Sequence, residues 1–226
     1  MPSPYSLLVF DWDGTLMDSS AKIVNCFAGA ARDMNMSRPD PERVKRYIGL
    51  SLTEAFSLLY PQINSAQINR LVDRYRDYWL VHDNTAMELF SGVREGLFEL
   101  QNAGYLLAVA TGKSRRGLER AMDTTKLDEL FVYTRCADQS RPKPDPSMLL
   151  DILDYTGLEK REAVMIGDTT FDLLMAGNAG VNGWGVSYGS HDHDELQALS
   201  GHPVMEEFSH LAAVLLGGDY PQTNVE

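Results

Sequence analysis

Four short apolar runs, each followed by polar residues or glycine, constrain the fold of this chain of 226 residues. Their length and their content of β-branched residues indicate buried strands. Helical patterns follow between the later runs, at 115–123, 146–156 and 170–179. Strands that alternate with helices imply right-handed β-α-β units, so we predict an α/β fold with a parallel sheet. The four runs are Ser6–Phe10, Leu106–Ala110, Ala163–Ile166 and Gly183–Val186.

The segment at about 18–85 interrupts this alternation, because it holds several helical patterns and no convincing strand. A helical block placed after the first strand predicts a cap domain inserted into the core. We therefore expect a core over 1–16 and 86–226 and a helical cap over 17–85, with the sheet resuming near Phe90. The helices expected in the cap are Ser19–Asn35, Asp40–Tyr47, Leu52–Tyr60 and Ala66–His82.

The balance of charge excludes some classes of partner. Lys and Arg number 20 against 32 Asp and Glu, which gives a formal net charge of −12. Such an acidic chain repels nucleic acid and anionic membranes, so we expect neither as a partner. A small anionic substrate stays compatible with this charge, because a few local cations and a metal can reverse the potential in one pocket.

Cysteine content and hydropathy favour a cytoplasmic protein. Cys26 and Cys136 form no framework of paired bridges and no C-x-x-C motif, and free thiols fit a reducing cytosol. The start of the chain lacks the basic segment and the long apolar core of a signal peptide. No apolar run approaches the roughly 20 residues that a membrane helix needs. For the assembly we expect a monomer or a homodimer.

Two carboxylates, Asp11 and Asp13, follow the first apolar run directly, in Phe10–Leu16 (FDWDGTL). In an open parallel sheet, ligands collect at the carboxyl ends of strands, so both side chains can face one bound group. One of them can attack phosphorus as a nucleophile while the other carries the proton of the leaving oxygen. Attack of one anion on another requires a cation, and hard oxygen ligands suit Mg²⁺.

An acidic turn that caps a helix is the alternative role of Asp11 and Asp13. An EF-hand loop is excluded by its register. The glycine of that loop belongs at the sixth position, whereas Gly14 stands at the fourth, and Lys22 stands at the twelfth. A catalytic role for the two carboxylates therefore requires partners elsewhere in the chain.

Thr111, at the end of another expected strand, is the first such partner. Its hydroxyl can donate to a phosphate oxygen, and Gly112 leaves backbone N–H groups open to the anion. Gly112-Lys113-Ser114 also suggests nucleotide binding. That P-loop, however, needs a glycine five residues before Gly112, where Leu107 stands. A helix N-cap is the alternative role of Thr111.

A lysine and two acids complete the candidate set. Lys143 stands between Pro142 and Pro144, whose rigidity lowers the entropy lost in holding its side chain against a phosphate. A solvated lysine in a proline-rich loop is the alternative. Asp168 and Asp172 share a helix face if the helix has begun, and they can ligate a metal, one directly and the other directly or through water. Helix capping is their alternative role.

Substrate choice is expected to depend on the cap. Lys45 and Arg46 precede the turn at Gly49, so either can enter the mouth of the site and bind the substrate. A solvent-facing helix charge is the alternative for both. His191 and His193, two residues apart in an acidic stretch, form either a second metal site or a solvated loop.

The chain resembles the haloacid dehalogenase superfamily of phosphohydrolases in four motifs and along nearly its whole length. The residues that match the motifs are Asp11 with Asp13, Thr111, Lys143, and Asp168 with Asp172. The resemblance implies a Rossmann-like core with an inserted helical cap of the C1 type. It also implies Mg²⁺ held by the Asp11 carboxylate, the Asp13 backbone carbonyl and Asp168.

The residue two positions after the nucleophile separates the chemistries of this superfamily. Dehalogenases lack an acid there and phosphonatases place a small residue there, so Asp13 favours hydrolysis of phosphate esters. The chain looks most similar to the phosphoglycolate phosphatase-like group in Asp11–Ser19, Ile48–Phe56 and Asp168–Gly180. We therefore expect an Mg²⁺-dependent phosphatase that hydrolyses phosphoglycolate or a sugar phosphate through a phospho-aspartyl intermediate on Asp11.

Two alternatives stay open. A β-phosphoglucomutase carries an arginine that grips a second phosphate where this chain has Leu52, although Arg46 or Lys45 can substitute for it. A non-catalytic binding protein of the same fold would lack one of the carboxylates or the lysine, and all of them are present. The physiological substrate, the cap residues that select it, the oligomeric state and the way Asp172 meets the metal stay open as well.

Overall fold

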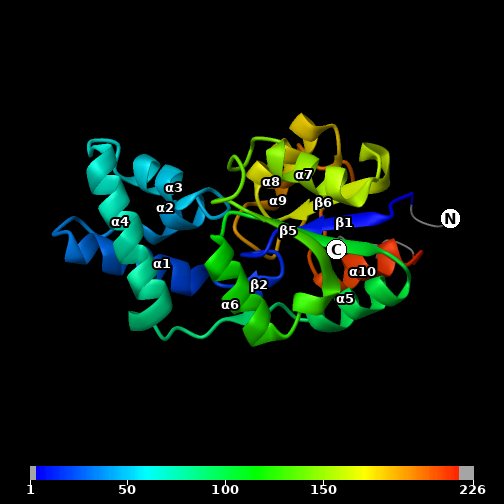
Figure 1. The fold of residues 1–226 in the computed structure, drawn as a ribbon, viewed down its shortest axis with the longest axis horizontal. Coiled ribbons are helices and arrows are strands. Elements are labelled where there is room, and N and C mark those ends of the chain that lie inside the picture. The colour runs from blue at the N-terminus through cyan, green and yellow to red at the C-terminus, as the bar shows by residue number, and fades with distance from the viewer. Residues whose placement is uncertain (1–3, 219–226) are drawn as a thin grey trace, which may run out of the picture.

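A five-stranded parallel sheet lies at the centre of the larger part of the molecule (Figure 1). The computed structural model describes residues 4–218, and the start of the chain and residues 219–226 lie outside this range. The strand order is β5-β4-β1-β6-β7, so the first strand of the sequence occupies the middle of the sheet. The strands are β1 (Leu7–Phe10), β4 (Leu106–Thr111), β5 (Phe131–Cys136), β6 (Ala163–Gly167) and β7 (Asn182–Gly185).

Helices cover both faces of this sheet (Figure 1). Alternate side chains of β1 point to opposite faces, as the pleat requires. Leu8 and Phe10 pack into one apolar cluster, and Leu7 and Val9 pack into another. The helices of the first cluster are α5 (Val93–Asn102), α6 (Arg115–Thr125) and α10 (Phe208–Leu215). Those of the second are α7 (Ser147–Thr156) and α8 (Thr170–Ala179). This confirms the predicted α/β fold.

The four predicted strands are confirmed, but β5 is a fifth strand that the sequence analysis missed. It lies at an edge of the sheet, and only its first and last residues are buried. An edge strand contacts a single neighbour, so its sequence (FVYTRC) carries no continuous apolar run. Local hydrophobicity therefore gives little sign of it.

The expectation that the sheet resumes near Phe90 is wrong. The strand at this place, β3 (Glu88–Leu89), pairs antiparallel with β2 (Met17–Asp18) outside the main sheet. Helix α5 then begins after Gly92, whose φ is +77°. The buried residues Val93, Leu97 and Leu100 of α5 recur at helical spacing, which explains why this segment packs as a helix against the sheet.

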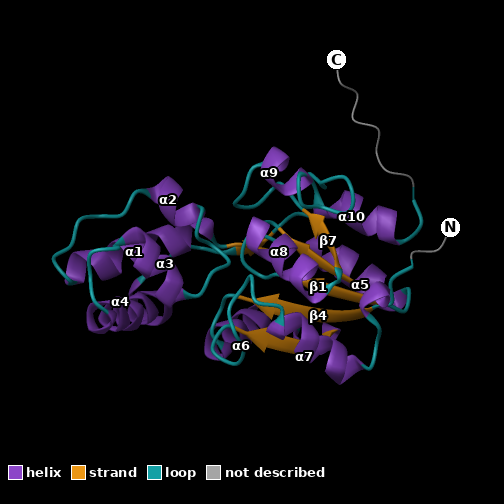
Figure 2. Cartoon of the chain, turned by 90° about the horizontal axis from the view of Figure 1, so that it is seen from above, coloured by secondary structure: helices purple, strands orange, loops and turns teal. Residues whose placement is uncertain are grey.

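Four helices and a short π-helical turn form a separate block (Figure 2). Side chains cap three of the helices at their first turn: Asp40, Ser51 and Asn64 accept hydrogen bonds from backbone N–H groups. The four helices predicted for the cap are confirmed, with their ends shifted by a few residues. They are α1 (Ser20–Asp33), α2 (Pro41–Lys45), α3 (Leu52–Leu59) and α4 (Ser65–Asp77), and the π-helical turn is Tyr78–His82.

The helical block has an apolar core of its own. The ring centroids of Phe27 and Phe56 lie 4.4 Å apart, and those of Phe27 and Tyr75 lie 5.0 Å apart. This core is distinct from the two clusters that flank the sheet. The block is therefore a helical cap inserted after β1. Its boundaries at residues 17 and 86 stay a prediction. None of the helices between residues 4 and 218 is long and apolar enough to cross a membrane.

We predict that Phe56→Ala destabilises the protein by about 3–5 kcal/mol, because it empties a fully buried site in the cap core. The matched control is Leu58→Ala on the same helix, since the Leu58 side chain is 45% exposed. Its effect on the free energy of unfolding should be much smaller. Urea unfolding followed by circular dichroism measures both values, and equal losses would contradict the assignment of Phe56 to the core.

Candidate active site

The carboxyl ends of β1, β4 and β6 bring the predicted motifs to one edge of the sheet. Asp11 follows β1 directly, Thr111 is the last residue of β4, and Asp168 follows β6. Lys143 reaches the same place from the loop before α7, and Asp172 from the first turn of α8. All five side chains are completely buried. The structure therefore brings together five residues that lie as far apart as 161 positions in the sequence.

Lys143 lies between two of the carboxylates. Its Nζ is 2.8 Å from Oδ1 of Asp11 and 2.6 Å from Oδ1 of Asp172. A buried ammonium is stable only with such partners, because burial removes its hydration. The alternative that Lys143 is a solvated loop lysine is therefore wrong.

Asp172 also fixes the start of α8. Its Oδ2 accepts hydrogen bonds from the backbone N (3.1 Å) and the hydroxyl (2.7 Å) of Thr169, the N-cap residue. Gly167 makes room for this carboxylate, since a Cβ there would lie 2.3 Å from Cγ of Asp172. Asp172 thus combines helix capping with an ion pair to Lys143, and both of its oxygens have partners.

Asp168 is held by two residues that the sequence analysis did not single out. Its Oδ1 accepts from the hydroxyl of Thr15 at 2.8 Å, and its Oδ2 accepts from the backbone N of Ser190 at 2.8 Å. Gly14, with a φ of +87°, passes close by, and a Cβ at this position would lie 2.1 Å from Oδ2 of Asp168. The glycine after the two aspartates is therefore required by the packing of the third.

The electrostatics of this group favour an additional cation. The pKa of Asp11 is raised to about 8, mainly by burial, with the ammonium of Lys143 opposing the shift and two neighbouring carboxylates adding to it. Burial also raises the pKa of Asp168 to about 7, with a further contribution from Asp172. Burial alone would lower the pKa of Lys143, but its two carboxylate partners outweigh burial and raise it. Three buried carboxylates thus share one ammonium, which leaves negative charge uncompensated.

The carboxylates of this group have acceptor capacity left for such a cation. Asp11 Oδ2, for example, is buried and accepts no hydrogen bond from the residues that the structure describes. Carboxylate oxygens of Asp11, Asp168 and Asp172 all lie within 4.8 Å of one another. A set of hard oxygen donors suits a divalent cation such as Mg²⁺. The residues present therefore fit a metal, whose direct ligands would come from this group.

Asp13 lies in a different environment from Asp11. Its Oδ1 accepts from the hydroxyl of Ser19 at 2.5 Å and from Nζ of Lys113 at 2.7 Å, and its Oδ2 is 2.8 Å from the same Nζ. Ser19 and Lys113 were missed by the sequence analysis. The residue order Gly112-Lys113-Ser114 suggests only the P-loop, and nothing local connects Lys113 with Asp13, 100 positions earlier.

Thr111 is not a helix N-cap, because Ser114 has that role in α6. The Thr111 oxygen accepts from the backbone N of Lys113 at 3.2 Å, so its hydroxyl hydrogen can point to another acceptor. Gly112 lies against the cap. A Cβ at this position would lie 2.6 Å from the carbonyl oxygen of Gly49 and 2.9 Å from that of Leu50. The cap loop is therefore closed over the strand ends.

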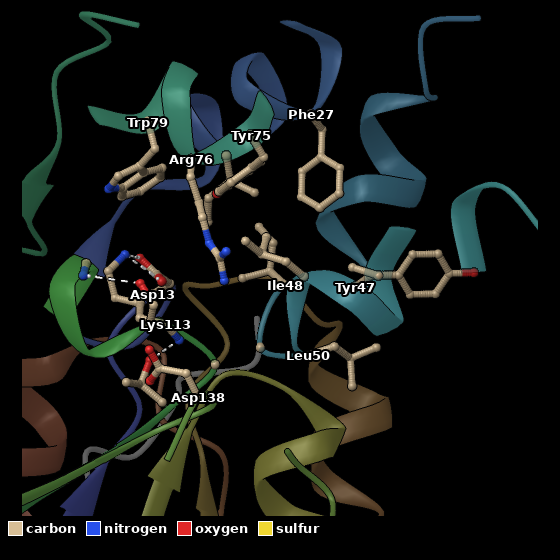
Figure 3. A pocket seen from close by; sticks show the side chains of 18 of the residues that line it. Asp13, Phe27, Tyr47, Ile48, Leu50, Tyr75, Arg76, Trp79, Lys113 and Asp138 are labelled. Carbon is tan, nitrogen blue, oxygen red and sulfur yellow. Dashed lines mark hydrogen bonds and ion pairs between the residues drawn. The ribbon is translucent and has the colours of Figure 1, made fainter. Parts of the chain in front are cut away.

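A cavity of about 590 Å³ lies between the cap and the core, and Asp11 and Asp13 are at its base. Figure 3 shows Arg76 of α4 pointing into it from the cap. Apolar side chains form most of the cap wall. Those labelled in Figure 3 are Phe27, Tyr47, Ile48, Leu50, Tyr75 and Trp79.

Lys45 and Arg46, expected to bind the substrate, are not among the described residues that line this cavity. Lys45 pairs with Glu42 at 2.9 Å on the surface of α2, and Arg46 pairs with Glu195 at 2.9 Å. Each cation thus has an acidic partner outside the cavity, which corrects the expectation. Arg76 enters the cavity in their place, and its own acidic partner, Asp73 at 3.5 Å, lines the same cavity. Arg76 was missed because its position on α4 shows no local sign of the direction that it faces.

His191 fits neither of the two expected roles, a second metal site or a solvated loop. The side chain is buried, and its ring nitrogens lie 3.2 Å from the backbone N of Thr170 and 3.1 Å from the carbonyl oxygen of Arg46. It therefore connects the start of α8 with the cap. His193 lies on the surface next to Asp194 at the start of the short helix α9 (His193–Gln197).

Comparison with known proteins gives consistent matches. The model of the family described as haloacid dehalogenase-like hydrolase matches residues 8–186. The probable phosphatase IndB of Dickeya dadantii is 35% identical over 207 residues, 90% of each chain. The pyrophosphatase PpaX of Bacillus cereus is 29% identical and covers 92% of this chain and 95% of its own.

Solved structures agree with these matches. A haloacid dehalogenase-like hydrolase of Bacteroides fragilis superposes with a TM-score of 0.86 at 28% identity, over 92% of this chain and 99% of that one. A protein of Haemophilus somnus described as a phosphoglycolate phosphatase has a TM-score of 0.84 at 22% identity, over 94% and 98%. The second likeness concerns the fold alone.

We predict that Lys143→Met lowers the free energy of unfolding by about 3–5 kcal/mol, because it leaves two buried carboxylates without their ammonium. Lys45→Met is the control. Its ammonium pairs with Glu42 on the surface, where solvent screens the interaction, so stability should barely change. Urea titration of both variants at neutral pH measures the difference. A Lys143→Met protein as stable as the wild type would contradict the structural role of this lysine.

Proposed function

Because the chain belongs to the haloacid dehalogenase-like hydrolase family and is a phosphatase, we propose that it hydrolyses a small phosphomonoester with Mg²⁺ as cofactor, through a phospho-aspartyl intermediate on Asp11. The observation that carries the proposal is the state of the Asp11 carboxylate. One of its oxygens is paired with Lys143, and the other is buried with no hydrogen-bond donor among the described residues. A nucleophilic carboxylate needs one oxygen without a hydrogen-bond donor, so that it can attack, and a nearby cation that neutralises its charge.

The first half of the reaction transfers the phosphoryl group to the enzyme. Asp11 Oδ2 forms a bond to phosphorus while the bond from phosphorus to the leaving oxygen breaks. Asp13, protonated at the start, gives its proton to that leaving oxygen and becomes a carboxylate. Lys143 neutralises charge on Asp11 and on the phosphoryl oxygens, and the Thr111 hydroxyl and the N–H groups near Gly112 donate to those oxygens.

The second half regenerates the enzyme. The Asp13 carboxylate takes a proton from a water molecule, whose oxygen attacks phosphorus. The bond between phosphorus and Asp11 breaks, inorganic phosphate leaves, and Asp13 is protonated again. The closed cap excludes bulk water during the first half and must open for release of the alcohol.

The Mg²⁺ site that we propose uses the carboxylates of Asp11 and Asp168 and the backbone carbonyl of Asp13. When bound, Mg²⁺ supplies positive charge that offsets the approach of a carboxylate to an anionic phosphoryl group. Asp172 serves as a ligand only through water in this proposal, because one of its oxygens is paired with the Lys143 ammonium and the other accepts two hydrogen bonds. Each oxygen of Asp168 accepts only one hydrogen bond and has no ammonium partner among the described residues.

The substrate class that we propose is phosphoglycolate or a sugar phosphate. A cavity of about 590 Å³ lies within the range of roughly 300–1,000 Å³ that holds organic ligands up to drug size. Arg76 at the cap wall favours a substrate with a second anionic or strongly polar group, and a pyrophosphatase is among the relatives. A mutase is less well supported. Leu52 lines the cavity where the mutase arginine would stand, and both Arg46 and Lys45 are paired elsewhere.

We also propose a cytoplasmic location. The thiols of Cys26 and Cys136 are free and buried, which agrees with a reducing compartment.

We predict that Asp11→Asn lowers kcat by at least about a thousandfold, since the amide is a poor nucleophile. The measurement is release of inorganic phosphate from a panel that includes phosphoglycolate, sugar monophosphates and pyrophosphate. Asp123→Asn, which changes an exposed acid on α6, serves as the matched control and should keep full activity. Substantial turnover by Asp11→Asn would rule out the covalent mechanism, and an isomerised sugar phosphate as product would favour the mutase.

We predict that Mg²⁺ raises the Tm of protein stripped with EDTA, because it binds the folded carboxylate group and not the unfolded chain. Asp168→Asn removes a charged ligand and should abolish most of this rise. Differential scanning fluorimetry gives the result without any substrate. The proposed site would be wrong if Asp168→Asn and the control Asp123→Asn responded to Mg²⁺ alike.

A further inference from the structure

Lys113 lies between the core and the cap at the cavity wall. Its Nζ contacts both carboxylate oxygens of Asp13, at 2.7 and 2.8 Å, and lies 4.2 Å from the ring centroid of Trp79. The Lys113 side chain is only 6% exposed. Figure 3 shows the ammonium between the two groups, with Asp13 contributed by the core and Trp79 by the cap.

Lys113 and Trp79 are each held in place by contacts of their own backbone segments. The Lys113 backbone is fixed by its N–H bond to the Thr111 hydroxyl oxygen at 3.2 Å, and its carbonyl oxygen accepts from the N of Ala137 at 3.0 Å. Trp79 belongs to the π-helical turn at 78–82, a local distortion that is common at functional sites. Arg120 of α6 donates to the carbonyl oxygen of Leu80 in this turn at 3.1 Å, which ties the turn to the core.

The position of the ammonium suits the task of Asp13. When Asp13 gives its proton to the leaving oxygen it acquires a negative charge, and the ammonium at 2.7 and 2.8 Å neutralises that charge. The bidentate contact also fixes the plane of the carboxylate. The Trp79 ring attracts the ammonium well within the roughly 6 Å limit of a cation–π contact, and it covers the lysine from water.

A second lysine provides an internal comparison. Lys22 is buried as well, and its Nζ lies 5.4 Å from the same Trp79 ring. Its ammonium donates to the carbonyl oxygen of Asp83 at 2.7 Å and lies 3.7 Å from the Asp83 carboxylate. Lys22 therefore shares burial, charge and the aromatic neighbour with Lys113, but its ion pair is with Asp83 and not with Asp13.

We propose that Lys113 is a positioning residue that orients Asp13 for proton transfer, and that it holds this orientation only while Trp79 of the closed cap lies against it. The proposal rests on the function proposed above, in which Asp13 is the general acid and base. Closure of the cap and readiness of the proton donor are then one event, linked through a single ammonium group.

The dependence on leaving group separates this role from a merely structural one. p-Nitrophenyl phosphate releases a stable phenolate that needs little protonation, whereas an alkyl phosphate releases an alkoxide that needs a proton donor. The value of kcat/KM covers the steps up to departure of the leaving group. It is measured for wild type, Lys113→Met, Lys22→Met and Asp13→Asn, on p-nitrophenyl phosphate and on the alkyl phosphate that the wild type hydrolyses best.

We expect Lys113→Met to lose about 100-fold in kcat/KM on the alkyl ester and less than about 10-fold on the aryl ester, in the same direction as Asp13→Asn. Lys22→Met should lose the same small factor on both. Trp79→Leu keeps Lys113 and removes its cap partner, so it should show the same selective loss in a weaker form. This second variant tests the proposal even if Lys113→Met fails to fold.

The proposal is overturned if Lys113→Met loses the same factor in kcat/KM on both esters. If Lys113→Met does not fold, equal losses in Trp79→Leu overturn it instead. A loss in Lys22→Met as selective as that in Lys113→Met also overturns it. If Asp13→Asn is selective and Lys113→Met is not, the proposed function stands and the role of Lys113 is rejected. A wild-type protein that hydrolyses neither ester with Mg²⁺ present rejects the proposed function itself.

Discussion

A completely buried ammonium group between two carboxylates is the interaction on which the rest of this structure depends. Lys143 joins Asp11, at the end of the central strand, to Asp172, in the first turn of α8. Each partner is anchored by regular structure, so the charges cannot separate without disturbing the sheet edge or the helix start. The apolar clusters on both faces of the sheet offset the cost of burying these charges.

The same group explains the contrast between the two aspartates of the first motif. Asp11 is completely buried beside two other carboxylates, while Asp13 faces the cavity and is paired with Lys113 and Ser19. Two residues of the same type, separated by one position, therefore have environments suited to different chemical tasks. The turn at Gly14 makes this division possible, because it lets the chain pass against Asp168 without a side chain.

Much of this arrangement could be predicted from the sequence, for a physical reason. The ends of parallel strands meet at one edge, so polar residues directly after apolar runs, such as Asp11, Thr111 and Asp168, had to come together. Contacts that depend on tertiary packing alone could not be read in this way. Lys113 and Asp13 are 100 positions apart, and Thr15 and Asp168 are 153 apart. The prediction that Lys45 and Arg46 enter the cavity was wrong, because each side chain pairs with an acid outside it.

The close approach of Gly112 to the cap loop separates two kinds of change that such a molecule can undergo in evolution. Closure is made by backbone carbonyl oxygens of Gly49 and Leu50 against a residue without a side chain, so it does not depend on which side chains the loop carries. The walls of the cavity, by contrast, are side chains such as Ile48 and Tyr47. Substitutions in those walls can alter which organic group fits inside while the cap loop still closes over the strand ends. A lineage can therefore change its substrate without rebuilding the machinery that cleaves it.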